Sequence, residues 1–304
     1  MLNIEKYAAI DIGSNAIRLL ITTIIEKSGA SPQFKKTSLV RVPIRLGADV
    51  FVTGKISEVN YLRMLDAMKA FCLLMKTNNV TRYRACATSA MREAENGQDI
   101  AEAIEKETGI PIHIIDGADE ALIIASTDLK SLIEENKVFL YVDVGGGSTE
   151  FTIFAYGKNV RSKSFKLGTV RLINDMVKEE VWTAVKDWIR THTKDFERVT
   201  LIGSGGNINS IYKNSGIKIG KPLSYFYLAA YYKTLKSYNY QERIFELNMN
   251  PDRADVIIPA TKIYLSAMKW SKARTMHVPK IGLSDGIIKG LYNEKLAKEI
   301  EVKN

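Results

Sequence analysis

The apolar residues of this 304-residue chain recur with two spacings, one typical of strands and one typical of helices. In the first half, short runs rich in β-branched residues predict strands at 7–10, 17–24, 38–46, 82–87 and 112–115. Apolar positions at three- and four-residue steps predict helices at 57–76, 98–108 and 116–129. Ser57 and Asp116 are placed to cap the first and last of these helices, and Gly109 to end the second.

The second half begins with the same kind of pattern. Strands are predicted at 138–144, 150–154 and 199–202, and helices at 181–196, 207–212, 225–237, 253–270 and 283–299. Pro259 falls inside the fourth of these helices, where it should kink the helix or mark a break.

One short pattern occurs at the start of each half. A strand, an aspartate, a glycine-containing turn and a second strand follow one another at Asp11 and again at Asp143. The repetition predicts two related α/β lobes rather than a short-period repeat. Two such lobes facing each other would form a cleft with one glycine loop on each wall.

The two halves of the chain also differ in net charge. The net charge is +9, with 17 Lys and Arg against 20 Asp and Glu in residues 1–150, and 26 against 14 in residues 151–304. The excess in the second part favours a polyanionic partner, although a solvated lysine-rich surface would give the same count. Nucleic acid is not favoured, because the lysines are dispersed and aromatic residues are not interleaved with them.

Several classes of protein are not indicated. No apolar run approaches the ~20 residues that a membrane span needs, and Asn3, Glu5 and Lys6 interrupt any signal-peptide pattern. Cys72 and Cys86 lie in apolar periodic segments, which predicts buried free thiols. The histidines show no metal-ligand spacing. We therefore expect a cytoplasmic protein that binds neither membrane nor nucleic acid.

The two glycine loops are the first candidates for chemistry. Residues 11–15 read Asp-Ile-Gly-Ser-Asn, and residues 143–149 read Asp-Val-Gly-Gly-Gly-Ser-Thr. Glycine lets the backbone turn tightly and direct several N–H groups at one anion, and phosphate offers only acceptor oxygens. A plain hairpin turn is the alternative, and it explains the first loop better than the second. The predicted phosphate-binding residues are Gly13, Ser14, Asn15, Gly145, Gly146, Gly147, Ser148 and Thr149.

A third glycine-rich segment, Gly-Ser-Gly-Gly-Asn at residues 203–207, follows a predicted strand and opens a helix. It departs from the dinucleotide fingerprint because Ile208 occupies the last glycine position, and it lacks the lysine of a P-loop. A helix N-terminus still attracts anions, but the pattern is weak on its own.

Three acidic residues flank the loops. Asp11 and Asp143 stand at strand ends just before them, and Glu150 stands on the strand that returns from the second. Carboxylates would repel a bound polyphosphate unless a divalent cation lay between, and Mg²⁺ prefers one or two carboxylates with phosphate oxygens and water. We therefore predict a Mg²⁺ site at Asp11, Asp143 and Glu150. The alternative is that the two aspartates only accept hydrogen bonds from loop amides.

Glu120 lies in the first turn of the helix predicted at 116–129. It either complements the helix dipole or deprotonates a water for in-line attack on phosphorus, since an unperturbed pKa of ~4.3 keeps it ionised at neutral pH. Arg92 either clamps a phosphate bidentately or forms a surface pair with Glu93 or Glu95. Further candidates on the same reasoning are Arg45, Arg171 and Arg253.

At these residues the chain resembles the exopolyphosphatase / guanosine pentaphosphate phosphohydrolase family. The similar segments follow the family's order through nearly the whole chain, at 8–21, 44–57, 85–97, 116–123, 142–151, 165–172, 203–211 and 254–260. The resemblance implies an α/β fold with two ribonuclease-H-like lobes of the actin, sugar-kinase and heat-shock ATPase superfamily and an interdomain cleft. The lobes are expected at 1–125 and 126–304, with the final helix, about 290–304, packing back on the first.

The resemblance also implies a reaction. Terminal orthophosphate would be released from inorganic polyphosphate, or the 5′ γ-phosphate from guanosine pentaphosphate, with Mg²⁺ as cofactor. By motif position, Glu120 is the catalytic base, Asp143 and Glu150 are the acids near water and metal, and Arg92 is a phosphate contact. The basic excess after residue 150 favours polyphosphate, because a long polyanion gains more from a dispersed basic surface. A homodimer is expected by resemblance alone.

Two other classes stay open. A kinase or ATPase of the same superfamily would need the loop at 203–207 to hold adenosine, together with a separate acceptor site. A sensor that only binds polyphosphate would have no need of Glu120 and Asp143.

Overall fold

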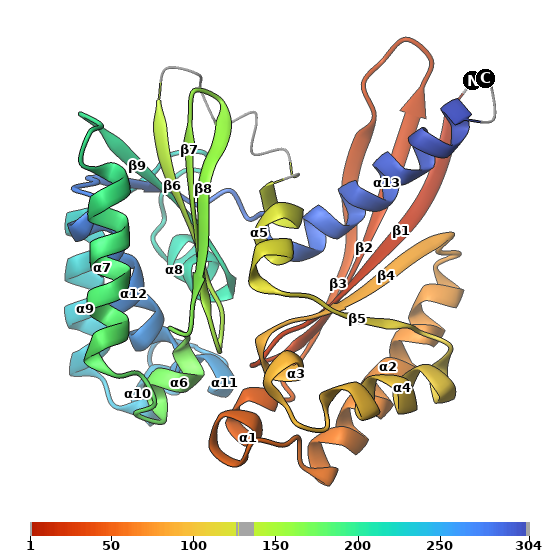
Figure 1. Cartoon of the computed structure of the whole chain (residues 1–304), viewed down its shortest axis with the longest axis horizontal. Coiled ribbons are helices and arrows are strands. Elements are labelled where there is room, and N and C mark those ends of the chain that lie inside the picture. Colours follow the sequence, from red (N-terminus) through yellow and green to blue (C-terminus); the bar gives the residue numbers. More distant parts are fainter. Residues whose placement is uncertain (1, 126, 128–136, 302–304) are drawn as a thin grey trace. The chain divides into compact units, whose positions relative to one another are not determined.

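The computed structural model of the chain describes residues 2–125, 127 and 137–301. The chain divides into two compact units, unit 1 with residues Met1–Thr127 and Leu283–Asn304 and unit 2 with residues Asp128–Gly282. Each unit is built on its own mixed β-sheet flanked by helices (Figure 1). The prediction of an α/β fold with two related lobes is therefore confirmed.

Unit 1 contains a five-stranded sheet in the order β3-β2-β1-β4-β5. The first three strands pair antiparallel, whereas β4 and β5 run parallel to β1. The carboxyl ends of β1, β4 and β5 therefore meet at one edge of the sheet, which is where polar loops can gather. The bounds are β1 Leu2–Ile12, β2 Ile17–Lys27, β3 Gln33–Val42, β4 Arg82–Ala87 and β5 Ile112–Ile114.

Six described helices belong to unit 1: α1 Leu46–Thr53, α2 Glu58–Thr77, α3 Ser89–Glu93, α4 Gly97–Thr108, α5 Gly117–Ala125 and α13 Leu283–Glu301. The C-terminal α13 packs on β1, β2, β4 and α5, while α2 and α4 pack together on the other side of the sheet (Figure 1). Gly286 allows the close approach of α13 to α5, because a Cβ there would lie 2.2 Å from the carbonyl oxygen of Ile123.

Unit 2 contains a six-stranded sheet in the order β10-β11-β9-β6-β7-β8. When the two-residue β10 is left out of the count, β8-β7-β6-β9-β11 repeats the 3-2-1-4-5 order and the strand directions of unit 1. The internal duplication predicted from the two Asp-x-Gly patterns is thus present in the topology. The bounds are β6 Val138–Val144, β7 Thr149–Ala155, β8 Lys158–Phe165, β9 Val199–Ser204, β10 Leu223–Ser224 and β11 Thr275–His277.

The longer helices of unit 2 gather on one side of its sheet (Figure 1). Their bounds are α7 Glu179–Thr193, α9 Tyr225–Ser237 and α12 Ile257–Trp270, and the shorter helices are α6 Thr169–Ile173, α8 Gly206–Asn214, α10 Tyr240–Phe245 and α11 Pro251–Ala254. Buried Tyr264 and Phe151 lie in the core between helices and sheet. In the described part of the chain, no helix combines the length and apolarity that crossing a bilayer requires.

Some predicted elements are wrong in their bounds. The extended run at 38–46 ends at Val42, because Pro43 has no amide to donate and Arg45 adopts a left-handed φ of 64° before α1 begins. The helix at 253–270 is two helices, and the break falls before Pro259, which lies in the first turn of α12. The last residues of the helix predicted at 116–129 lie outside the described residues.

Other elements were not predicted. Strand β8 is almost entirely exposed and polar, so it lacks an apolar alternation. Helices α1, α3 and α6 were also missed, because they are too short to show a helical period. Of the two thiols, Cys86 is buried as predicted, but Cys72 is only partly buried.

A partly buried charge cluster anchors α13 to the sheet of unit 1. The Lys295 ammonium lies 2.6 Å from a carboxylate oxygen of Glu5 and 2.8 Å from one of Glu26. The Tyr292 hydroxyl donates to Glu26 at 2.7 Å. The hydrogen bonds from Lys295 and Tyr292 lower the pKa of Glu26 to about 2. The ionised form of Glu26 is therefore stabilised by folding.

We expect this cluster to make the stability of unit 1 depend on acid pH. The unfolded Glu26 has a pKa of roughly 4.3, so the stabilisation is present above that value and is lost as the pH falls toward the folded pKa of about 2. Urea unfolding between about pH 5 and pH 2.5 measures the slope. The Glu26→Gln variant should show a smaller slope than the wild type, and equal slopes would contradict the prediction.

Candidate functional site

The first glycine loop, residues 13–16, joins β1 to β2 and is closed by a hydrogen bond from the Gly13 amide to the Ala16 carbonyl at 3.1 Å. Its outer side is held by two neighbours. The Gly47 amide at the start of α1 donates to the Ser14 carbonyl at 2.8 Å, and the buried hydroxyls of Ser14 and Ser89 lie 2.9 Å apart. A Cβ at Gly47 would lie 2.7 Å from the Phe51 ring and 3.0 Å from the Ser14 Cβ, which explains why this position is a glycine.

The second glycine loop, residues 145–148, joins β6 to β7 and closes in the same way, with the Gly145 amide 3.0 Å from the Ser148 carbonyl. Its carbonyls face α6. The Gly145 carbonyl accepts from the Thr169 amide at 3.0 Å, and the Gly146 carbonyl accepts from the Val170 amide at 2.8 Å. The Gly147 carbonyl accepts from Nε of Arg171 at 2.7 Å.

These bonds determine where the loop amides point. In a trans peptide the carbonyl and the following N–H point in opposite directions, and the described chain has no cis peptide. Since three successive carbonyls face α6, the amides of Gly146, Gly147 and Ser148 face away from it. Among the described residues, nothing accepts a hydrogen bond from the amides of Gly146 and Gly147. Consecutive amides on one side form an anion-binding concavity.

The acidic residues of unit 1 lie at the carboxyl end of its parallel strands. Asp11 is 6 % exposed and pairs with Arg18 at 3.0 Å. Burial raises its pKa, and the neighbouring guanidinium opposes that shift. Cys86 stands opposite Asp11 in the ladder, and its pKa is raised to about 11, first by burial and further by the charges of Asp11 and Glu120. The thiol therefore stays neutral beside two carboxylates.

Glu120 is held in the first turn of α5 and is 9 % exposed. Asp116 caps that helix, because its side chain accepts from the amides of Ala118 at 2.7 Å and Asp119 at 2.8 Å. Those two amides lower the pKa of Asp116. Glu120 is therefore buried and not a solvated complement to the helix dipole, and its catalytic role stays a prediction.

The acidic residues of unit 2 stand opposite each other in the β6–β7 ladder, Asp143 against Glu150. Glu150 is 2 % exposed, and its Oε1 accepts from the hydroxyls of Ser148 at 2.6 Å and Ser164 at 2.9 Å. Across residues 2–125, 127 and 137–301, no three His, Cys, Asp or Glu side chains gather closely enough to hold a metal ion. Asp11 belongs to the other unit, and its part in a metal site stays a prediction.

The third glycine-rich segment lies beside Asp143. In the β6–β9 ladder Asp143 stands opposite Ser204, and a Cβ at Gly205 would lie 3.3 Å from the Asp143 carboxylate. Gly205 also has a φ of 110°, which disfavours any other residue. The Tyr264 hydroxyl donates to the Ser204 carbonyl. The structure thus joins the second and third loops around one carboxylate.

Three of the four arginines predicted to contact phosphate donate to backbone carbonyls. Arg92 donates to the Ile115 carbonyl at 2.6 Å, just before α5. Arg171 donates to Gly147, and Arg253 donates to the Gly206 carbonyl at the start of α8. Each of these hydrogen bonds stabilises a segment in which the sequence predicted site residues. A phosphate contact by Arg92 stays a prediction, as does one by Arg45.

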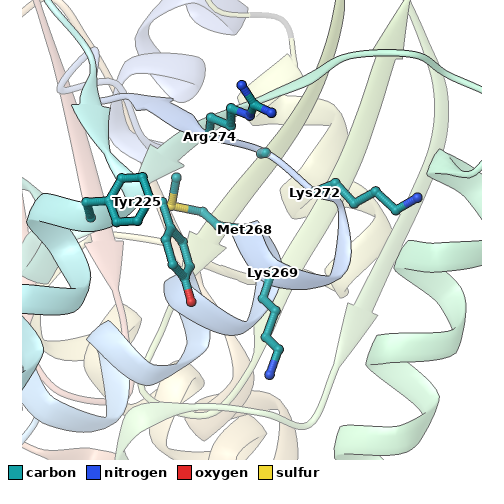
Figure 2. A pocket seen from close by; sticks show the side chains of 7 residues that line it. Tyr225, Met268, Lys269, Lys272 and Arg274 are labelled. Carbon is teal, nitrogen blue, oxygen red and sulfur yellow. The ribbon is translucent and has the colours of Figure 1, made fainter.

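A separate pocket of about 540 Å³ lies elsewhere in unit 2, between the start of α9 and the end of α12. Tyr225 and Met268 line it together with Lys269, Lys272 and Arg274. Figure 2 shows the three cationic side chains extending in different directions rather than toward a common point. A ligand site needs converging polar groups, so this pocket is not the candidate active site.

The sequence did not indicate how the loops are held. Ser89, Gly47 and the α6 segment position the loops, and of these residues only Arg171 of α6 was predicted, as a phosphate contact and not as a support of the loop. One signal was available: a basic residue, leucine and glycine occur at 45–47 and again at 166–168, once after each glycine loop. Gly168 has the same function as Gly47, because a Cβ there would lie 2.2 Å from the Gly146 carbonyl oxygen.

Comparison with known proteins finds curated relatives that each match more than half of the chain. Exopolyphosphatase 2 of Mycobacterium tuberculosis is 31 % identical over 178 residues, which are 56 % of this chain and 54 % of the relative. The guanosine-5′-triphosphate,3′-diphosphate pyrophosphatase of Aeromonas hydrophila is 28 % identical over 176 residues, 58 % of this chain and 34 % of the relative. The chain spans about half the length of the curated relatives it matches.

The crystal structure of the Aquifex aeolicus member of the Ppx/GppA protein family matches with a TM-score of 0.75 at 25 % identity, covering 96 % of this chain and 99 % of that one. The model of the Ppx/GppA phosphatase family matches residues 24–295. The resemblance drawn from the glycine loops and the segments between them is confirmed over most of the sequence. This chain belongs to the Ppx/GppA phosphatase family.

Proposed function

We propose that this protein is a Mg²⁺-dependent exopolyphosphatase that hydrolyses terminal orthophosphate from inorganic polyphosphate. The observation that carries the proposal is the second glycine loop. Its carbonyls face α6, so three successive amides face the opposite way, beside Asp143 and Glu150. Amides so directed suit the terminal phosphate of an anionic chain. The membership of the Ppx/GppA phosphatase family supports the same reaction.

Glu120 is the proposed general base. It orients a water and removes its proton as the water attacks phosphorus, in line with the departing phosphate chain. Its position in the first turn of a capped helix, with the backbone before it braced by Arg92, keeps the carboxylate in one place. A general base of this kind contributes a factor of about 10² to 10⁴ to the reaction rate.

The carboxylates of unit 2 fit Mg²⁺. Asp143 and Glu150 stand opposite each other at the mouth of the loop, and the surrounding donors are oxygens, which a hard cation prefers. One or two carboxylates are what Mg²⁺ takes when phosphate supplies other ligands. When bound, the ion would neutralise charge on the phosphate oxygens. Asp11 already forms an ion pair with Arg18, so its carboxylate depends less on a metal ion for charge compensation.

Replacing Glu150 with glutamine should weaken Mg²⁺ binding. We expect the half-saturating Mg²⁺ concentration for phosphate release to rise by about 10- to 100-fold, the range found when groups around a metal site are removed. Calorimetric titration with Mg²⁺ alone compares the Mg²⁺ affinity of Glu150→Gln with that of the wild type in the absence of substrate. The matched control is Glu180→Gln, which alters an exposed carboxylate on α7. An unchanged Mg²⁺ dependence in Glu150→Gln would remove Glu150 from the metal site.

The substrate is tested by measuring orthophosphate release from polyphosphate and from guanosine pentaphosphate, each with and without Mg²⁺. The excess of 26 Lys and Arg over 14 Asp and Glu after residue 150 favours the longer anion. Faster release from guanosine pentaphosphate would reverse the substrate assignment while retaining the hydrolase. Consumption of ATP only when a phosphate acceptor is present would instead indicate a kinase.

A further inference from the structure

One carbonyl of the second glycine loop is held differently from the other two. The carbonyls of Gly145 and Gly146 accept from backbone amides of α6, and these bonds would survive most side-chain changes. The Gly147 carbonyl accepts from a side chain, the Nε of Arg171 at 2.7 Å. The direction of the peptide between Gly147 and Ser148 therefore depends on the identity of one residue.

Arg171 is built into this position. It is 7 % exposed and lies on α6, only two residues after the amide that holds Gly145. The Thr149 hydroxyl donates to the Leu167 carbonyl, which ties the other end of the loop to the same segment. Gly168 lets the two segments touch, because a Cβ there would overlap the Gly146 carbonyl. The contact between α6 and the loop is thus continuous over its whole length.

We infer that Arg171 is a positioning residue that directs the Ser148 amide at the phosphate, acting through the Gly147 carbonyl. In a trans peptide, holding that carbonyl toward α6 holds the next N–H away from it, on the same side as the amides of Gly146 and Gly147. The inference rests on the proposed function for its ligand, a phosphate group. Lysine cannot substitute, because Nε of arginine donates from within a rigid planar group.

The first test needs no activity. In the ligand-free protein, ¹⁵N relaxation of the Ser148 amide should show a rigid backbone, with an order parameter of about 0.85, and Arg171→Met should lower it toward about 0.6. The matched control is Arg161→Met, which removes an exposed arginine on β8 that bonds only locally. Equal rigidity in wild type, Arg171→Met and Arg161→Met would overturn the inference.

The second test is kinetic. A loop amide binds phosphate in the ground state and the transition state alike, so its loss should raise KM for polyphosphate about tenfold and change kcat less. Guanidinium ion added to Arg171→Ala should restore KM, whereas Arg171→Lys should behave like Arg171→Met. A lower melting temperature with unchanged KM would show that Arg171 only packs, and would overturn the inference.

A second variant covers the case in which Arg171→Met does not fold. Gly168→Ala keeps Arg171 but places a Cβ 2.2 Å from the Gly146 carbonyl oxygen. It should therefore displace the same loop without removing the bond donor. This variant should also raise KM for polyphosphate and lower the order parameter of the Ser148 amide. Wild-type values of both would contradict the role of the α6 contact in positioning the loop. If wild type releases no phosphate at all, the proposed function fails, and the relaxation comparison still decides the positioning by Arg171.

Discussion

Replacing Glu120 with glutamine is expected to lower kcat for orthophosphate release by roughly 10²- to 10⁴-fold, the usual contribution of a general base. Glutamine has nearly the same shape and can occupy the same buried position, but it cannot accept the proton of the attacking water. KM should change little, because the side chain is not proposed to hold the substrate. The measurement is phosphate release under saturating polyphosphate and Mg²⁺.

The neighbouring carboxylate supplies the control. Asp119 lies in the same turn of α5 but is exposed, so Asp119→Asn changes the charge of the helix terminus without touching the buried position. Its activity should stay within a few-fold of wild type, since an exposed charge at a helix terminus contributes about 0.3–1 kcal/mol. Equal losses in both variants would show that Glu120 acts through the helix dipole and not as a base.

Replacing Lys295 with alanine is expected to destabilise unit 1 by about 3 kcal/mol, because breaking a buried ion pair leaves its partner charge uncompensated. The ammonium is 8 % exposed and forms ion pairs with two carboxylates, Glu5 and Glu26, that are each 24 % exposed. Burial disfavours the charged lysine, but the bonds to Glu26 and Glu5 outweigh that and raise its pKa. Urea unfolding at neutral pH measures the change.

The control for this change lies one turn further along α13. Lys298 is exposed, and Lys298→Ala should shift the free energy of unfolding by no more than about 0.5 kcal/mol. Lys295→Met retains an apolar stem and separates lost packing from lost charge. If Lys295→Ala and Lys298→Ala have equal effects, the cluster does not anchor the helix to the sheet.

The elements that the sequence predicted well are those with strong local signals. The strands at 82–87 and 138–144 and the helix at 225–237 have their predicted bounds, and Ser57 caps α2 as expected. The strand at 138–144 is a nearly continuous apolar run that ends at a glycine loop, and the helix at 225–237 follows the capping residue Ser224. Elements without such a signal were missed, above all β8, which pairs with β7 through backbone bonds while its first six side chains are exposed.

The candidate site divides in the same way. The positions of both glycine loops were predictable, because each follows an aspartate at the end of a strand and each is closed by a bond between its first and last residues. The residues that orient the loops were not. Arg171 reads in the sequence as a phosphate clamp, and only the fold shows its Nε at the Gly147 carbonyl.

The sequence by itself determined the repeated α/β pattern, the two glycine loops, the acids next to them and the family resemblance, because all of these depend on residues adjacent in the chain. The tertiary structure decided which way the loop amides point, that Glu120 is buried, and that Gly205 lies against Asp143. These facts depend on contacts between segments tens of residues apart. A peptide's direction is set by the partner its carbonyl finds, and that partner is known only once the chain has folded.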